Sequence, residues 1–153
     1  MHKKSTEELE DILRNTHPSS IADFLQDNAS DLMQQGKLFS EYMHKILRRN
    51  GLTQQEVFLQ ADFPERYGYK ILSEEKRTKQ RDYLLRICYA AQMTLEETQQ
   101  ALTLYGMAPL YARIPRDAVL MIAFNQRKGS ILEVNALLSK HKMPILKTCG
   151  NLE

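Results

Sequence analysis

The sequence lacks several features that define other classes of protein. Its two cysteines, Cys88 and Cys149, are too few for a metal-binding tetrad and lie far apart, which favours a reduced, cytoplasmic protein with incidental thiols. The longest apolar run, residues 118–124, is far shorter than the roughly 20 residues that cross a membrane. The first ten residues contain no apolar stretch typical of a secretory signal. We therefore expect a cytoplasmic protein that does not contact a membrane.

Residue patterns that would support catalysis are also missing. The four histidines show no metal-ligand spacing, and the six glycines are scattered and form no phosphate-binding loop. Cys88 lies in the apolar run LLRICYAA, where a buried thiol is usually inert. The acidic pairs Glu74/Glu75 and Glu96/Glu97 suit solvated turns or first helical turns better than acid–base dyads. We predict that the protein is not an enzyme and binds no cofactor or metal.

The charge is small in total but unevenly distributed. The 153 residues carry 21 basic and 19 acidic side chains, a formal charge of +2, which fits one globular domain with a core. Residues 1–36 have three basic and seven acidic side chains, whereas residues 106–153 have seven and three. Residues 39–105 are nearly balanced, with ten and nine. The chain therefore has an acidic beginning and a basic end.

The composition and the local signals predict an all-α protein. Leucine occurs 21 times and valine only three times, and no segment alternates apolar and polar residues as a strand would. A Ser or Thr followed three residues later by Glu, the pattern that caps a helix start, occurs at Ser5/Glu8, Thr53/Glu56, Thr94/Glu97 and Ser130/Glu133. Candidate helix ends lie at Gly36, Gly51, Gly106 and Gly129, and candidate first-turn prolines at Pro64 and Pro115.

These signals together predict nine helices and no strand. We expect the helices at residues 5–15, 20–35, 39–50, 53–61, 64–73, 80–92, 94–105, 115–128 and 130–141. The short helices between residues 39 and 105 must dock on one another, because a helix of about nine residues is not stable alone. Their apolar stripes predict a shared core, formed by Leu47, Leu52, Val57, Ala61, Ile71, Leu84, Leu85, Ile87, Ala91, Leu95 and Leu102.

Within this bundle, residues 52–56 read LTQQE, which matches an L-T-Q-x-E helix entry. On these residues the segment 39–105 resembles the Xre-type helix-turn-helix family, the DNA-binding domains of phage repressor and Cro type. The resemblance covers a little under half of the chain. It implies a compact five-helix repressor-like bundle whose second and third helices form the helix-turn-helix. The chain would then divide into an acidic N-terminal helical extension (1–36), a helix-turn-helix domain (37–106) and a C-terminal helical extension (107–153) packed on the same core.

The resemblance also implies a DNA interface. The third helix, about residues 64–73, would lie in the major groove of double-stranded DNA and expose Glu65, Arg66, Tyr69 and Lys70. Arg66 could bind guanine through two hydrogen bonds, and Lys70 could reach guanine or a phosphate. Residues at the amide-rich start of the second helix would hold a phosphate: Thr53, Gln54 and Gln55. The following loop would add positive charge through Lys76, Arg77, Lys79 and Arg81.

Two interpretations of this bundle stay open. Gly68 lies in the middle of the third helix, where the family packs a β-branched residue, and Glu65, Glu74 and Glu75 would repel passing phosphates. The first interpretation is a transcriptional regulator that binds DNA. The second is a non-catalytic protein-interaction adaptor that uses Tyr67, Gly68, Tyr69 and the acidic front end.

The flanking segments also allow alternatives. Residues 113–128 form a helix that is apolar all round its middle, so it is either buried within the monomer or pairs with a second copy in a homodimer. The N-terminal helices are amphipathic with an acidic outer face. They could cap the bundle, cover its basic face or bind a partner protein.

Overall fold

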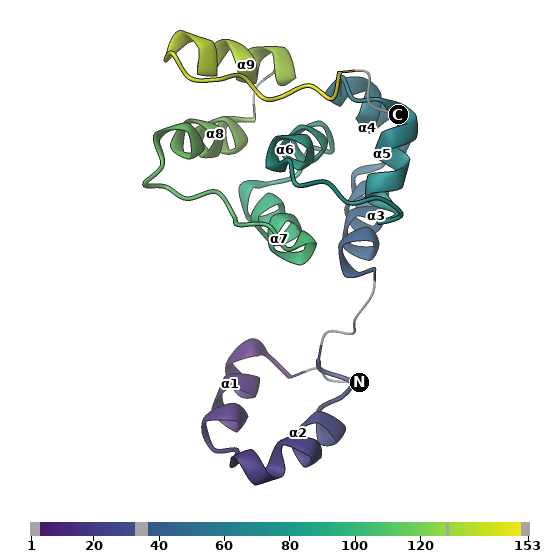
Figure 1. The fold of residues 1–153 in the computed structure, drawn as a ribbon, viewed down its shortest axis with the longest axis vertical. Helices are drawn as coiled ribbons and strands as arrows, with labels where there is room; N and C mark the ends of the chain where they lie inside the picture. The colour runs from purple at the N-terminus through teal and green to yellow at the C-terminus, as the bar shows by residue number, and fades with distance from the viewer. Residues whose placement is uncertain (1–3, 33–36, 128, 151–153) are drawn as a thin grey trace. The chain divides into compact units, whose positions relative to one another are not determined.

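The computed structural model describes residues 4–32, 37–127 and 129–150, and in these ranges it is all α-helical (Figure 1). It divides into two units, residues 1–36 and 37–153. The helices are α1 (Thr6–Arg14), a 3₁₀ turn η1 (Pro18–Ser20), α2 (Ile21–Asp27), α3 (Leu38–Asn50), α4 (Gln54–Ala61), α5 (Glu65–Leu72), α6 (Arg81–Ala90), α7 (Leu95–Tyr105), α8 (Pro115–Gln126) and α9 (Ile131–Lys140). Eight predicted helices agree with these bounds to within two residues.

The second predicted helix, residues 20–35, is wrong at its C-terminal end. Helix α2 ends at Asp27, and residues 28–32 form turns. The backbone N–H and the side-chain amide of Asn28 both donate to the Phe24 carbonyl, at 3.0 Å each, which closes the last turn. Lys4 holds the following turn through the Asn28 and Asp31 side chains. Predicted positions 33–35 lie outside the described residues, as does Gly36.

The predicted helix starts are confirmed at three of four positions. Ser5, Thr53 and Thr94 each accept a hydrogen bond from the backbone N–H three residues on, and Thr94 forms the full reciprocal box with Glu97. The box predicted at Ser130 is wrong, because the Ser130 side chain makes no capping bond to α9. The carboxylate of Glu133 lies instead over Gly129.

A glycine ends a helix when it adopts the left-handed backbone conformation directly after it. Gly51 and Gly106 adopt it directly after α3 and α7, with φ of 67° and 89°. After α8, Arg127 itself adopts it with φ of 46°, so Gly129 is not the capping residue predicted for that helix. Pro64 is the residue before α5, one position ahead of the predicted first turn, whereas Pro115 opens α8.

Helix α6 is the centre of the unit formed by residues 37–153, surrounded by other helices (Figure 1). All residues from Asp82 to Tyr89 are buried, and α6 contacts α4, α7 and α9. The eleven predicted core residues are all in or against this core: Leu52 and Leu95 are partly buried and the other nine are buried. The hydrophobic periodicity of the sequence therefore identifies the core.

A buried arginine links the core to the end of the described chain. We call residues 144–150 the C-terminal strap, an irregular segment that leaves α9 and runs toward α4 and α5 (Figure 1). Arg86 is only 2% exposed and donates to three backbone carbonyls, those of Ala61 at 3.0 Å, Leu146 at 2.9 Å and Lys147 at 2.8 Å. One side chain therefore joins the C-terminal end of α4 to the strap.

Two Arg–Asp dipeptides at helix starts cross-link α6 and α8. Arg81 binds Asp117 at 2.5 Å, and Arg116 binds both carboxylate oxygens of Asp82, at 3.0 and 2.9 Å. Asp82 also accepts the backbone N–H of Lys147 in the strap, at 3.0 Å. Burial opposes ionisation, but the hydrogen bonds from Arg116 and Lys147 outweigh it and lower the pKa of Asp82.

The N-terminal unit differs in how little it buries. Neither α1 nor α2 contains a buried residue, and Leu13, Ile21 and Leu25 are each more than half exposed. Lys4 donates to the Asn28 side chain and pairs with Asp31 within this unit.

Candidate nucleic-acid interface

Helices α4 and α5 are joined by a tight turn of three residues. Asp62 closes α4 in the left-handed conformation, with φ of 50°. Phe63 is buried, its N–H donates to the Phe58 carbonyl, and its ring stacks on Tyr67 with centroids 5.7 Å apart. Pro64 lies directly before α5, so the turn consists of an exposed Asp62, a buried Phe63 and a half-buried Pro64. Three residues is a turn length found between the two helices of a helix-turn-helix.

Gly68 allows α5 to approach α4 closely. A Cβ atom at this position would lie 2.5 Å from the Phe58 ring, closer than any real contact. Phe58 also meets the Tyr69 ring edge-on, with centroids 5.3 Å apart. The glycine that departs from the family pattern therefore has a packing role, because the Phe58 ring occupies the space of its missing side chain.

The exposed face of α5 brings together the four residues predicted to face DNA bases. Glu65, Arg66 and Tyr69 are exposed and Lys70 is half-buried, whereas Gly68, Ile71 and Leu72 are buried on the inner face. Partial burial and a hydrogen bond to Glu65 raise the pKa of Tyr69, so its hydroxyl stays a neutral donor at physiological pH. The face thus offers an arginine, a lysine and a phenol.

The three residues at the start of α4 have different surroundings. The Thr53 hydroxyl already accepts the Glu56 N–H as the helix cap. The Gln54 amide lies 2.9 Å from Nε2 of His44, whose Nδ1 is 2.7 Å from the Ser40 carbonyl and must donate to it. Gln55 is exposed. Gln54 is thus held by α3, whereas Thr53 and Gln55 are both exposed.

The basic residues of the loop after α5 fall into two groups. Lys76 and Lys79 are exposed. Arg77 lies over the Tyr105 ring, 4.1 Å from its centroid, donates to the Tyr105 carbonyl and pairs with Glu74 at 3.3 Å. Arg81 is paired with Asp117. Two of the four predicted loop contacts, Arg77 and Arg81, are therefore engaged in holding the fold.

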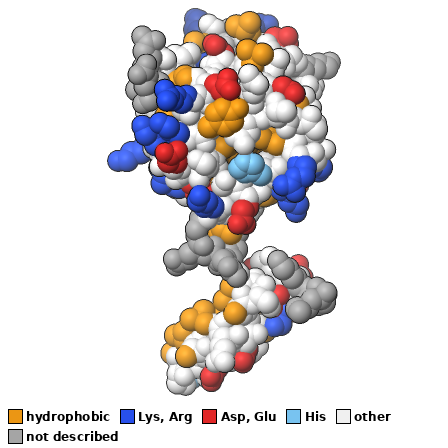
Figure 2. Space-filling model, turned by 90° about the vertical axis from the view of Figure 1, so that its right-hand side faces the viewer, with side chains coloured by type: hydrophobic (Ala, Val, Ile, Leu, Met, Phe, Trp, Pro, Cys, Tyr) orange, Lys and Arg blue, Asp and Glu red, His pale blue; other side chains and the backbone are white. Residues whose placement is uncertain are grey.

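The surface over α3, α4 and α5 is mixed in charge. Figure 2 faces this side of the 37–153 unit, with basic side chains near both borders and acidic and hydrophobic side chains between them. The basic residues therefore do not form one continuous stripe in this view. A nucleic acid lying here would meet positive charge mainly at the two borders.

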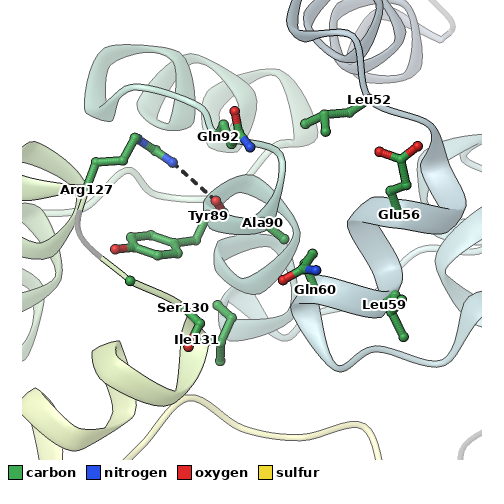
Figure 3. Close-up of a pocket in the computed structure, with 11 residues that line it drawn as sticks. Leu52, Glu56, Leu59, Gln60, Tyr89, Ala90, Gln92, Arg127, Ser130 and Ile131 are labelled. Carbon is green, nitrogen blue, oxygen red and sulfur yellow. Dashed lines mark hydrogen bonds between the residues drawn. The ribbon is translucent and has the colours of Figure 1, made fainter.

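A cavity of about 460 Å³ with a mixed polar and apolar lining lies between α4, the end of α6, Arg127 and residues 129–131 (Figure 3). On one side Arg127 donates to the Tyr89 carbonyl at 3.2 Å, and its guanidinium lies over the Tyr89 and Phe124 rings. Burial lowers the pKa of Arg127. On the other side Glu56 and Gln60 project from α4. The walls thus carry opposite charges.

The two cysteines are buried and free. Burial raises the pKa of the Cys88 thiol to about 12 and that of Cys149 to about 11, so both are protonated at physiological pH. Within the described ranges, no group of three or more His, Cys, Asp or Glu could hold a metal ion. No helix of the described chain is long and apolar enough to cross a membrane.

The sequence did not predict the polar network that joins α4, α6, α8 and the strap. Arg86 was in a helix predicted only to be amphipathic, and the partners of Asp82 and Asp117 lie 34 and 36 residues away. The signal available in the sequence is the repeated Arg–Asp dipeptide at two predicted helix starts, residues 81–82 and 116–117. The dipeptides mark the positions but do not reveal the pairing.

Comparisons with known proteins add no relative: no family model matches the chain, no curated protein matches its sequence and no solved structure matches its fold.

Proposed function

We propose that residues 37–106 are an Xre-type helix-turn-helix domain that binds double-stranded DNA and regulates transcription. The observation that carries the proposal is the three-residue turn between α4 and α5 together with the exposed face of α5. In this proposal α5 enters the major groove. Arg66 binds guanine O6 and N7, Lys70 reaches a guanine or a phosphate, and Tyr69 and Glu65 complete the face.

Phosphate contacts would flank this helix. Thr53 and Gln55, at the start of α4, lie where backbone N–H groups and the helix dipole favour an anion. Lys76 and Lys79 would add charge to the contact with the DNA backbone. Arg77 acts in this scheme by holding the loop against α7, because its guanidinium is already bound to Tyr105 and Glu74.

The proposal includes a homodimer and a cytoplasmic location. A dimer formed by the C-terminal helices would present two copies of α5 to paired half-sites in DNA.

Fluorescence anisotropy with mixed-sequence duplex DNA, at about 50 and 200 mM salt, tests DNA binding, because phosphate contacts weaken steeply over that range. We expect salt-sensitive binding that the double variant Arg66→Ala/Lys70→Ala weakens at least about tenfold. The matched control is Arg113→Ala/Lys142→Ala, which removes the same charge from exposed positions of the C-terminal region. Equal losses in both double variants would show attraction by total charge and contradict a reading role for α5.

The mixed charge of this surface favours a second candidate function. Glu65 and Glu74 lie among the basic residues, and Glu74 neutralises Arg77 directly. A non-catalytic protein-interaction adaptor could use this surface, with the aromatic residues Tyr67 and Tyr69 beside Gly68 as its contacts. Absence of DNA binding at low salt, by protein shown to be folded, would exclude the first function and favour the adaptor.

A further inference from the structure

The outer side of helices α8 and α9 carries exposed apolar side chains. Ile122 of α8 is 58% exposed, and Leu132 and Leu137 of α9 are 80% and 40% exposed. The inner side of α8 is already used in the monomer, because Leu120 and Phe124 are buried in the core. Of the predicted apolar helix at residues 113–128, α8 therefore buries one side within the monomer and leaves Ile122 exposed, and residue 128 lies outside the described residues.

A groove of about 400 Å³ lies between the two helices on this side. Its apolar lining includes Ile122, Val134, Ala136 and Leu137. Of the exposed apolar side chains, Ile122 and Leu137 line this groove, and an exposed apolar groove marks a contact site.

The charges along α9 specify which partner fits. Glu133 and Lys140 line the same groove and are seven residues apart, two helical turns, so they stand on one side of the helix. If a second α9 packs antiparallel about a two-fold axis between Ala136 and Leu137, Glu133 of each copy meets Lys140 of the other. In the same register the small side chain of Ala136 faces Leu137 of the second copy, so a bulky residue meets a small one.

We propose that α9 is the dimer interface, paired antiparallel with α9 of a second copy through this groove. The proposal rests on the homodimer proposed above and names its surface, its symmetry and its charge pairs. A two-fold interface uses the same patch twice, so the patch must be complementary to itself. The face of α9 meets this condition in charge and in side-chain size. The Glu133 carboxylate, which lies over Gly129 in the monomer, turns outward to pair.

Mass in solution, measured on the full chain by light scattering or sedimentation at several protein concentrations, tests the proposal without DNA. We expect a dimer for the wild type. The single reversals Glu133→Lys and Lys140→Glu each create two like-charge contacts per dimer and should raise the dissociation constant at least about tenfold. The double variant Glu133→Lys/Lys140→Glu restores both pairs with inverted sign and should dimerise again. The matched control Glu96→Lys reverses an exposed charge on α7 and should leave the dimer intact.

Several results would overturn the inference. A wild type that is monomeric at every concentration excludes the interface, and a dimer unaffected by the single reversals places the contact elsewhere. Monomeric single variants without recovery in the double variant contradict the antiparallel register. Leu137→Glu, with far-UV circular dichroism and thermal midpoint as checks on folding, should also be monomeric. Because DNA is absent from all these measurements, their failure is distinct from a failure of the DNA-binding proposal.

Discussion

The two units of the chain use similar amphipathic helices in different ways. Helix α1 has a strongly segregated apolar side, yet α1 and α2 contain no buried residue. Helix α6 is less segregated, yet eight of its residues are buried because neighbouring helices surround it. Periodicity therefore reveals which side of a helix is apolar, whereas burial depends on what the rest of the chain places against that side.

The units also differ in the polar groups that hold them. In the N-terminal unit the long-range contacts join Lys4 to Asn28 and Asp31 at a partly buried site. In the 37–153 unit, the charged side chains of Arg86 and Asp117 are buried, and removing one partner of a buried charge lowers the free energy of unfolding strongly. All seven tyrosines lie between residues 42 and 111, and tryptophan is absent. Tyrosine fluorescence therefore reports on the 37–153 unit alone, whereas far-UV circular dichroism reports on both.

The largest expected effect follows from removing the buried guanidinium of Arg86. In Arg86→Ala, the carbonyls of Ala61, Leu146 and Lys147 lose their donor inside the core. We expect the free energy of unfolding to fall by about 3 kcal/mol or more, measured by urea unfolding with tyrosine fluorescence. The unfolding free energy of Arg86→Lys should lie between those of Arg86→Ala and the wild type, because one ammonium cannot replace the planar guanidinium at all three carbonyls. A loss in Arg86→Ala as small as that of a surface substitution would show that the strap is not bound through this side chain.

A matched pair of leucine truncations compares the two units directly. Leu102 is 0% exposed in α7, and Leu25 is 52% exposed in α2. Leu102→Ala should cost about 2–5 kcal/mol, because it removes buried methyl groups and leaves a cavity. Leu25→Ala should cost no more than about 0.5 kcal/mol, as is usual for surface substitutions. Thermal and urea unfolding followed by circular dichroism would measure both, and similar losses would show that the apolar side of α2 is covered.

Lowering the pH should reduce the free energy of unfolding by less than Arg86→Ala or Leu102→Ala does. The folded pKa of Asp82 lies below its ordinary value of 3.8, so the unfolded state takes up the proton first as the pH falls. The stability that Asp82 contributes is therefore present above that value and is lost as the pH falls through the lower, folded pKa. The pKa of Glu97 is also lowered from its ordinary value of 4.5, chiefly by the hydrogen bond to Arg49 and further by the Thr94 cap. Glu97 therefore also contributes stability that is lost as the pH falls.

The variant Asp82→Asn isolates this contribution. It cannot ionise, so its unfolding free energy should decline less between about pH 5 and pH 2 than that of the wild type, measured by urea unfolding at each pH. Parallel declines in the two proteins would show that Asp82 does not contribute to the acid sensitivity.

The sequence predicted the local part of the structure well. Capping at Ser5, Thr53 and Thr94 and the buried positions of the core depend on residues a few positions apart, which periodicity and spacing reveal. The predictions that were wrong depended on competing local bonds: Asn28 ends α2 early, and Ser130 does not form its expected cap.

The long-range polar contacts could not be predicted. The exposed face of α5 follows from its helical spacing: Arg66 and Tyr69 are exposed and Lys70 is half-buried, whereas their contact with DNA stays a prediction. That Arg77 is engaged by Tyr105 depends on a contact 28 residues away, which no local pattern contains. The family resemblance covers only residues 39–105, so it could not predict the strap formed by residues 144–150.

The strap also affects the order in which the protein can be completed during synthesis. Arg86 lies in α6, at the centre of the bundle, but two of its three acceptors, the carbonyls of Leu146 and Lys147, are translated 60 and 61 residues later. A nascent chain that has α3 to α7 but not yet residues 146 and 147 can pair this guanidinium only with the Ala61 carbonyl and leaves its other two donors to water. The bundle can therefore collapse early on the ribosome but reaches its final core only after the strap has emerged.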